Sequence, residues 1–330
     1  MKFSVGYQLC SDSEFVDEII KNRDSIYEVY FSWSDYANGR NSQIRKSGLT
    51  PWEAQKFIEE DIKRISDAGI KLNILFNAMC YGENSQSRSF FEGIGNTLEY
   101  LLANYNLASL TTTSLLVAKF VKENFPMLDV RASVNMDIGT VEGLDYVKEY
   151  FDSFYIRREL NRDFGEIRKF KSWCDENGKT LYALANSGCL NYCSAHVFHD
   201  NLVAHEAEIS KMDNGYNFEG VCRSYFKNPE NHFALSQRLG YIRPEDTELY
   251  EGIFPALKLA TRVSKNPTKI LKAYIKGKHS GSTLDLLEPN HSGVIYPYVL
   301  ENSKIISKVQ NEKLTYNIEN ALIKLEGELC

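Results

Sequence analysis

Short runs of β-forming residues alternate with longer helical segments along most of this 330-residue chain, and this alternation constrains the fold more than any other feature. Turn and helix-capping residues stand at the joins, which is the pattern of repeated βα units. The eight strands that the pattern predicts span 2–9, 25–32, 71–78, 108–113, 128–135, 152–158, 180–186 and 254–261.

Two of the intervening helices have clear start and stop signals. Thr50 can cap the first turn of one helix, with Pro51 at the first helical position and Glu53 completing a capping box. Gly69 ends this helix. A second helix is predicted over 163–178, because an aspartate opens it and a glycine closes it. The predicted buried stripe of the first helix is Phe57, Ile58, Ile62 and Ile65.

Eight strands in this alternation fit either a closed (β/α)8 barrel or an open doubly wound sheet, and periodicity alone does not separate the two. No GxGxxG follows the first strand, which disfavours a dinucleotide-binding version of the open sheet. The alternation is lost near the C-terminus. We therefore predict an α/β domain over 1–264 and a short C-terminal extension over 265–330 that packs on it and contains a helix at 315–327.

Composition and charge narrow the function. The hydrophobic content of 43% is enough to bury a full core. The net charge of −6 provides no broad basic surface, so we expect no general nucleic-acid-binding face. The first residues turn polar by position 11, and no window approaches the roughly 18 apolar residues of a membrane span. We therefore expect a cytoplasmic protein without membrane contact.

Cysteine placement suggests a metal or cluster site. The count of seven is odd, which argues for thiols, metal ligands or core residues rather than a disulfide framework. Cys189 and Cys193 follow the strand at 180–186, with a glycine before the first of them, and Cys222 can return to the same face as a third ligand. Unrelated buried thiols are the alternative. Cys330, on the packed extension, could complete a four-thiolate set.

Zinc is a simpler alternative to a cluster. His196 and His199, together with two of the cysteines, make an acceptable tetrahedral set.

Arginines gather at the predicted strand ends and suit an anionic substrate. Arg158 and Arg162 follow the sixth strand, and Arg243 precedes the eighth. A guanidinium at a barrel mouth can bind a carboxylate or phosphate through paired hydrogen bonds. The same arginines could instead pair with neighbouring acids. We expect these three arginines to orient an anionic small molecule or a nucleobase-like ring.

Four landmarks resemble, in order, those of the collagenase-like peptidase family, peptidase family U32. They are LFNAMCYG, RRELNRDF, ANSGCLNYCSAHVFHDN and YIRPED followed by FPALKLATR. The resemblance spans roughly 1–265 and implies a TIM-type barrel. Relatives implicated in oxygen-independent ubiquinone hydroxylation and in prephenate-dependent tRNA or rRNA hydroxylation use cysteine-ligated [4Fe-4S] clusters. The resemblance therefore implies a similar cluster here, at Cys189, Cys193 and Cys222.

The chain also departs from the family pattern. Its paired cysteines are closer together than in the better-known peptidase signature, and Ser32 and Ser34 stand where some relatives have a cysteine. The fourth cluster ligand therefore remains open between Cys330, Cys10, Cys80 and an unligated iron.

Three functions follow from these features. The first is an iron–sulfur enzyme that hydroxylates its substrate without molecular oxygen or transfers another atom. The second is a non-catalytic partner subunit whose cluster stabilises the fold or carries electrons in a heteromeric complex. The third is a zinc-dependent or other peptidase. The serines near Cys189 show no nucleophile, base and acid arrangement that would make proteolysis convincing.

Overall fold

A closed barrel of eight parallel strands forms the centre of the computed structural model, with the strands in chain order around it. The first and last strands pair directly, Val5 lying beside Leu259, and this pairing closes the barrel. The predicted fold class, a TIM-type (β/α)8 barrel, is therefore confirmed. The strands are β1 (Phe3–Gly6), β2 (Ile26–Phe31), β3 (Lys71–Phe76), β4 (Leu107–Thr112), β5 (Asp129–Ala132), β6 (Ser153–Tyr155), β7 (Thr180–Leu184) and β8 (Leu257–Leu259).

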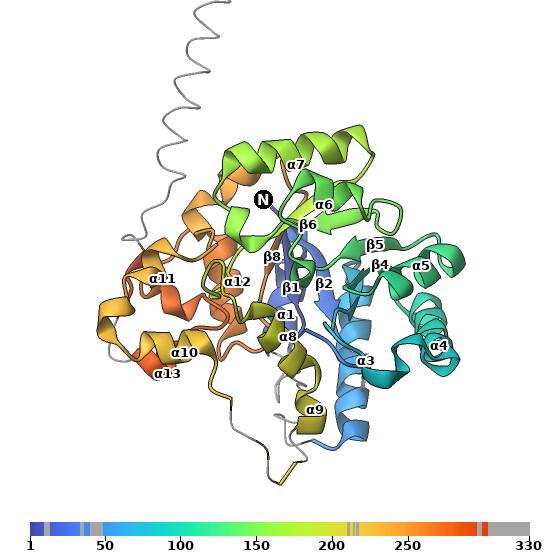
Figure 1. Ribbon diagram of the computed structural model, residues 1–330. Helices are drawn as coiled ribbons and strands as arrows, with labels where there is room; N and C mark the ends of the chain where they lie inside the picture. The colour runs from blue at the N-terminus through green and yellow to red at the C-terminus, as the bar shows by residue number, and fades with distance from the viewer. Residues whose placement is uncertain are drawn as a thin grey trace, which may run out of the picture.

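Helices surround the strands, with α3, α4 and α5 on one side and α10, α11, α12 and α13 on the other (Figure 1). The structure describes residues 1–9, 14–33, 36–39, 49–209, 212–213, 215, 218–295 and 299–302. The helices are α1 (Glu14–Lys21), α3 (Pro51–Asp67), α4 (Arg88–Asn104), α5 (Leu115–Asn124), α6 (Val141–Asp145), α7 (Phe164–Glu176), α8 (His196–Ala204), α9 (Glu206–Ile209), α10 (Val221–Phe226), α11 (Ala234–Gln237), α12 (Pro267–Ile275) and α13 (Ser292–Ile295).

The capping signals act as predicted. The Thr50 side chain accepts from the backbone N–H of Glu53, and the Glu53 carboxylate accepts in return from the backbone N–H of Thr50, at 2.9 Å. The inner face of α3 consists of Ala54, Ile58, Ile62 and Ile65. Phe57 was wrongly placed in this face, because it is 46% exposed. Its neighbour Ala54 occupies the inward position one turn earlier, and 54, 58, 62 and 65 follow the helical period more closely.

The barrel interior contains a buried polar network rather than an apolar plug. Arg131 of β5 is 1% exposed and donates to Glu28 of β2 at 2.5 Å and to Asp129 at 2.7 Å. Its guanidinium lies 3.9 Å from the ring centre of Tyr182 on β7. Ser4 of β1 also donates to Glu28, at 3.0 Å. Side chains of four strands are thus tied together inside the barrel, where the fold normally packs layers of side chains.

The connection from β7 to β8 is long and carries α8, α9, α10 and α11. After β8, the helix α12 packs beside α1 and against the turn at 244–250. The predicted boundary between 264 and 265 stays a prediction, and the helix expected at 315–327 lies outside the described residues. None of the helices that the structure describes is long and apolar enough to span a membrane.

Candidate functional site at the barrel mouth

The cysteine loop, defined as 186–193, follows β7 at the carboxyl end of the barrel, where TIM-type barrels build their sites. Asn186 is fully buried and fixes the start of this loop. Its amide nitrogen donates to the carbonyls of Ala260 and Leu286, at 2.8 Å each, and its carbonyl oxygen accepts from the Ala260 N–H at 2.6 Å. All these bonds are buried, so they hold the cysteine loop firmly against β8 and the segment that follows α12.

A close backbone contact leaves no room for a side chain at Gly188. A Cβ atom at this position would lie 2.0 Å from the carbonyl oxygen of Pro289. The Gly188 N–H donates to the Glu288 carbonyl at 2.9 Å, and the Gly188 carbonyl lies 2.8 Å from Nε2 of His291. The glycine before Cys189 therefore lets the segment 288–291 approach the cysteine loop.

Replacing Gly188 by alanine is expected to lower the free energy of unfolding by about 1–3 kcal/mol, because the new methyl group must displace backbone atoms in a packed region. Gly293→Ala is the matched control, since nothing lies within 4 Å of its added Cβ. Urea denaturation followed by circular dichroism measures both. Equal stability of the two variants would contradict the role assigned to the Pro289 contact.

Cys189, Cys193 and Cys222 lie near one another, the first two from the cysteine loop and the third from the start of α10. Burial raises the pKa of Cys222 to about 11, and the charges of Cys189 and Cys193 act in the same direction. All three cysteines are free thiols and partly buried. The structure therefore brings together the three predicted ligands, although their ligand role stays a prediction.

A cluster and a single metal ion place different demands on the spacing of their ligands. Across the described ranges, no three His, Cys, Asp or Glu side chains are arranged so that they could hold one metal ion. In an iron–sulfur cluster the thiolates bind different irons, so they stand farther apart than ligands of a single zinc. Thiolates are also the ligands that such clusters prefer. Cys10 and Cys330, both considered as a fourth ligand, lie outside the described residues.

The histidines of the zinc alternative have other surroundings. Nδ1 of His196 lies 3.1 Å from a carboxylate oxygen of Asp137. The ring of His199 lies 6.0 Å from that of Phe218, measured between centres. Neither histidine forms a single-ion site with the cysteines within the part of the chain that the structure describes.

Three side chains beside the cysteine loop form what we call the mouth cluster: Asp137, Arg158 and His196. Asp137 follows β5 in a left-handed conformation with φ of 51°, and Arg158 follows β6. One carboxylate oxygen of Asp137, Nε of Arg158 and Nε2 of His196 are buried, and they have no hydrogen-bond partner among the described residues. Nε2 of His196 lies 3.1 Å from the Asp200 carboxylate, without the geometry of a hydrogen bond.

Charge in the mouth cluster favours an ionised Asp137. Burial opposes ionisation, but the hydrogen bond from His196 and the charges of His196, Arg158 and Arg157 outweigh it and lower the pKa of Asp137. Buried polar atoms without partners are costly and gather at functional sites. The mouth cluster is therefore a polar, partly unpaired surface that a substrate could complete.

The other two predicted arginines have protein partners. Arg162 donates through Nε to the backbone carbonyl of Tyr241. Arg243 makes two hydrogen bonds to Asp246, at 2.7 and 2.8 Å, and is 7% exposed. These contacts hold the segment before β8 in place. Arg158 also donates, through Nη2 to Oδ1 of Asn135 at 3.4 Å, although its Nε has no partner among the described residues. A substrate role for all three arginines stays a prediction.

Sequence reasoning missed two features near the carboxyl ends of the strands. The first is a set of three interacting side chains, those of Cys80, His205 and Glu208. Nδ1 of His205 lies 2.6 Å from the Glu208 carboxylate. Cys80 comes from the loop after β3, His205 follows the last residue of α8, and Glu208 belongs to α9. Because these segments are far apart in the sequence, no spacing motif marks them.

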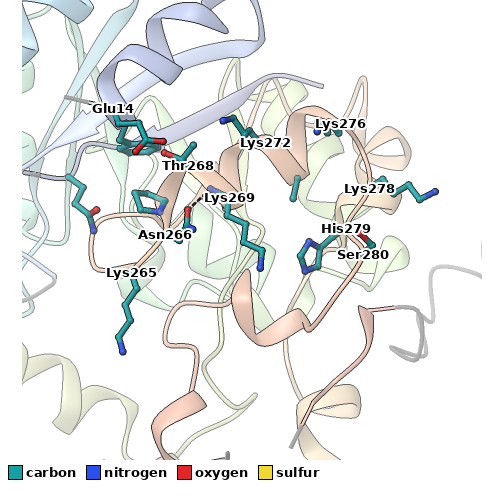
Figure 2. Close-up of a pocket in the computed structure, with 14 residues that line it drawn as sticks. Glu14, Lys265, Asn266, Thr268, Lys269, Lys272, Lys276, Lys278, His279 and Ser280 are labelled. Carbon is teal, nitrogen blue, oxygen red and sulfur yellow. Dashed lines mark hydrogen bonds between the residues drawn. The ribbon is translucent and has the colours of Figure 1, made fainter. Parts of the chain in front are cut away.

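The second feature is a basic pocket of about 890 Å³ beside α12, which Figure 2 shows with lysine side chains along it. Lys269 and Lys272 pair with Asp285 and Glu18, at 2.6 and 3.2 Å. The five lysines of the pocket are Lys265, Lys269, Lys272, Lys276 and Lys278. None of the predicted cysteines or arginines that the structure describes lines this pocket, so its positive charge belongs to a different part of the surface from the mouth cluster.

Comparison with known proteins supports the fold alone. No family model matches the sequence, and no curated protein matches it. Among solved structures, the barrel is similar to that of a U32 peptidase, with a TM-score of 0.54 and 14% identity over 78% of this chain and 91% of that chain. A conserved Enterococcus faecalis protein of unknown function reaches a TM-score of 0.43 at 9% identity, over 84% of this chain and 66% of that chain. The chain therefore has a barrel like that of a U32 peptidase.

Proposed function

We propose that this protein is an enzyme of the U32 peptidase-like group that binds a [4Fe-4S] cluster at the barrel mouth. The observation that carries the proposal is the gathering of Cys189, Cys193 and Cys222 at one place beside the mouth cluster. The substrate is a small anionic or nucleobase-like molecule. The reaction is an oxygen-independent hydroxylation or a related atom transfer.

The cysteines, Arg158 and His196 would have different roles in the proposed reaction. The three cysteines would hold the cluster, which supplies a Lewis acid or atom-transfer centre when one iron has no protein ligand. Arg158 presents a buried, unpaired Nε toward an anionic group. His196 is held through Nδ1 by Asp137, so its buried Nε2 is the atom that can accept or donate a proton.

The two alternative functions make different demands on the structure. A zinc peptidase would need a single-ion site, and the described residues assemble none from His196, His199 and the cysteines. A non-catalytic partner subunit would need no polar surface at the mouth, whereas the mouth cluster leaves three buried polar atoms unpaired there. The unpaired polar atoms support an enzyme rather than a partner subunit. A cytoplasmic location agrees with an oxygen-sensitive cluster and remains part of the proposal.

The metal content of anaerobically purified protein tests the proposal. We expect about four irons and four acid-labile sulfides per chain, as the cluster requires, together with a broad visible absorption that bleaches on reduction. Stoichiometric zinc without sulfide would contradict the iron–sulfur proposal and support the zinc site instead. Protein that takes up neither metal, even after anaerobic reconstitution with iron and sulfide, would leave the cysteines as partly buried thiols without a ligand role.

A further inference from the structure

Cys80 lies at the carboxyl end of the barrel, in the loop that follows β3, and is partly exposed. The backbone N–H of Gly82 donates to its sulfur at 3.3 Å. The imidazole of His205 forms a side-chain hydrogen bond with the same sulfur. The loop turns sharply here, because Gly82 has φ of +66°, and an added Cβ at Gly82 would lie 4.0 Å from Cε1 of His205. His205 therefore lies beside the loop that holds the Cys80 thiol.

Glu208 holds the other side of the imidazole. Its carboxylate lies 2.6 Å from Nδ1 of His205, on a ring that also interacts with Cys80. His205 stands at the C-terminal end of α8, where the negative end of the helix dipole favours a protonated ring. The result is a nucleophile, a base and an orienting acid in line, the arrangement of thiol and serine acyl-transfer enzymes.

The pKa shifts of Cys80 and His205 agree with this arrangement. The hydrogen bond from Gly82 and then that from His205 lower the pKa of Cys80. The hydrogen bonds to Glu208 and then to Cys80 raise the pKa of His205. Both shifts favour the thiolate and imidazolium forms over the neutral pair, and a thiolate is the nucleophilic form of cysteine.

We propose that Cys80, His205 and Glu208 form a second reactive centre, in which Cys80 accepts the acyl group of an ester or amide as a thioester. The sulfur of Cys80 attacks the carbonyl carbon, so that a C–S bond forms while the C–O or C–N bond breaks. The leaving group takes the proton held by His205. Water then attacks the thioester, gives a proton back to His205, and releases a carboxylic acid and the free thiolate.

This centre is separate from the proposed cluster. The strongest influences on Cys80 come from Gly82, His205 and Glu208, whereas those on Cys222 include Cys189 and Cys193. The hydrogen bonds of Cys80 give it a role of its own, so we do not assign it as the fourth cluster ligand. Acyl transfer at Cys80 requires no metal and no oxidant.

The reactivity of each cysteine toward iodoacetamide, located by peptide mass spectrometry on the full-length protein, tests the activated thiol. Cys80 is expected to react with a pH midpoint below the ordinary value of about 8.5. His205→Ala is expected to raise that midpoint and to slow labelling at pH 7 by about tenfold, because one pKa unit changes the thiolate fraction tenfold. Cys174→Ser, at a fully buried position in α7, is the control and should leave Cys80 labelling unchanged.

Acylation by p-nitrophenyl acetate tests the reaction itself. We expect a burst of about one p-nitrophenolate per chain, with the acetyl group on Cys80, and no such burst from a folded Cys80→Ser protein. Glu208→Gln should keep the burst but slow it, since the carboxylate only orients the ring. Acetylation that misses Cys80, or that occurs at Cys80 at the same rate in His205→Ala, would overturn the proposal.

Discussion

Replacing Arg131 by methionine is expected to lower the free energy of unfolding by about 3–5 kcal/mol, which is the cost of leaving a buried carboxylate without its partner. Arg131 is fully enclosed in the barrel, where it donates to Glu28, Asp129, Ser153 and Tyr182. Burial opposes its charge, yet Glu28 and then Asp129 overcome this and raise its pKa well above the usual range. Methionine fills much of the volume but supplies no donor, so Glu28 loses its counter-ion.

The measurement is urea denaturation near pH 7 for the wild type and three variants. Arg64→Met is the matched control, because Arg64 makes ion pairs with Asp17 and Asp61 at the exposed surface, and its loss should cost at most about 1 kcal/mol. The double variant Arg131→Met, Glu28→Gln should recover part of the stability, since it removes the unpaired charge. An Arg131→Met protein as stable as Arg64→Met would show that the network inside the barrel contributes little.

The barrel could be predicted because its signals are local. All eight predicted strands are present, and all but β4 are shorter than their β-forming runs, whereas β4 keeps its length and begins one residue earlier, at Leu107. The extra residues at their ends, such as Asn77 and Asn186, continue the β-type pattern but turn into the loops of the mouth. Phe57 was misplaced because apolarity does not distinguish a core position from an exposed one next to it. Choosing between a barrel and an open sheet needed the family resemblance, since both use the same βα units.

The candidate site was only partly predictable. Cys189 and Cys193 form a spacing motif within one loop, and Cys222 could be added because its place in the chain lets it return to the same face. Contacts between distant loops leave no such mark. His196 was considered as a zinc ligand, whereas Asp137, from the loop after β5, binds its ring. Cys80 and His205 meet in the same way, because α8 ends near the loop after β3. Loop conformation determines these pairs, and periodicity carries no information about it.

Replacing Cys222 by serine is expected to remove most of the iron from anaerobically reconstituted protein, which makes it the sharpest test of the ligand set. Serine keeps the size of the side chain but lacks the thiolate that iron–sulfur clusters require. The side chain of Cys222 is partly buried beside the core. Its pKa is raised by burial and then by the charges of Cys189 and Cys193, so the three thiols are close enough to interact. A cluster held by these three residues would lose one of only three ligands among the described residues.

Cys174→Ser separates a ligand effect from a general effect of losing a thiol. Cys174 is fully buried in α7, and burial raises its pKa to about 12, so it has neither the access nor the ionisation that a ligand needs. We expect this control to lose some stability but to keep its iron, sulfide and visible spectrum. If Cys222→Ser binds as much iron and sulfide as Cys174→Ser, then Cys222 is not a ligand, and the gathering of the three thiols reflects packing of α10 against the cysteine loop. If Cys222→Ser alone loses the iron–sulfur cluster, Cys222 is the third ligand, and it comes from the long connection between β7 and β8. The iron–sulfur cluster then lies beside Asp137, Arg158 and His196, where an anion bound by these residues can reach it.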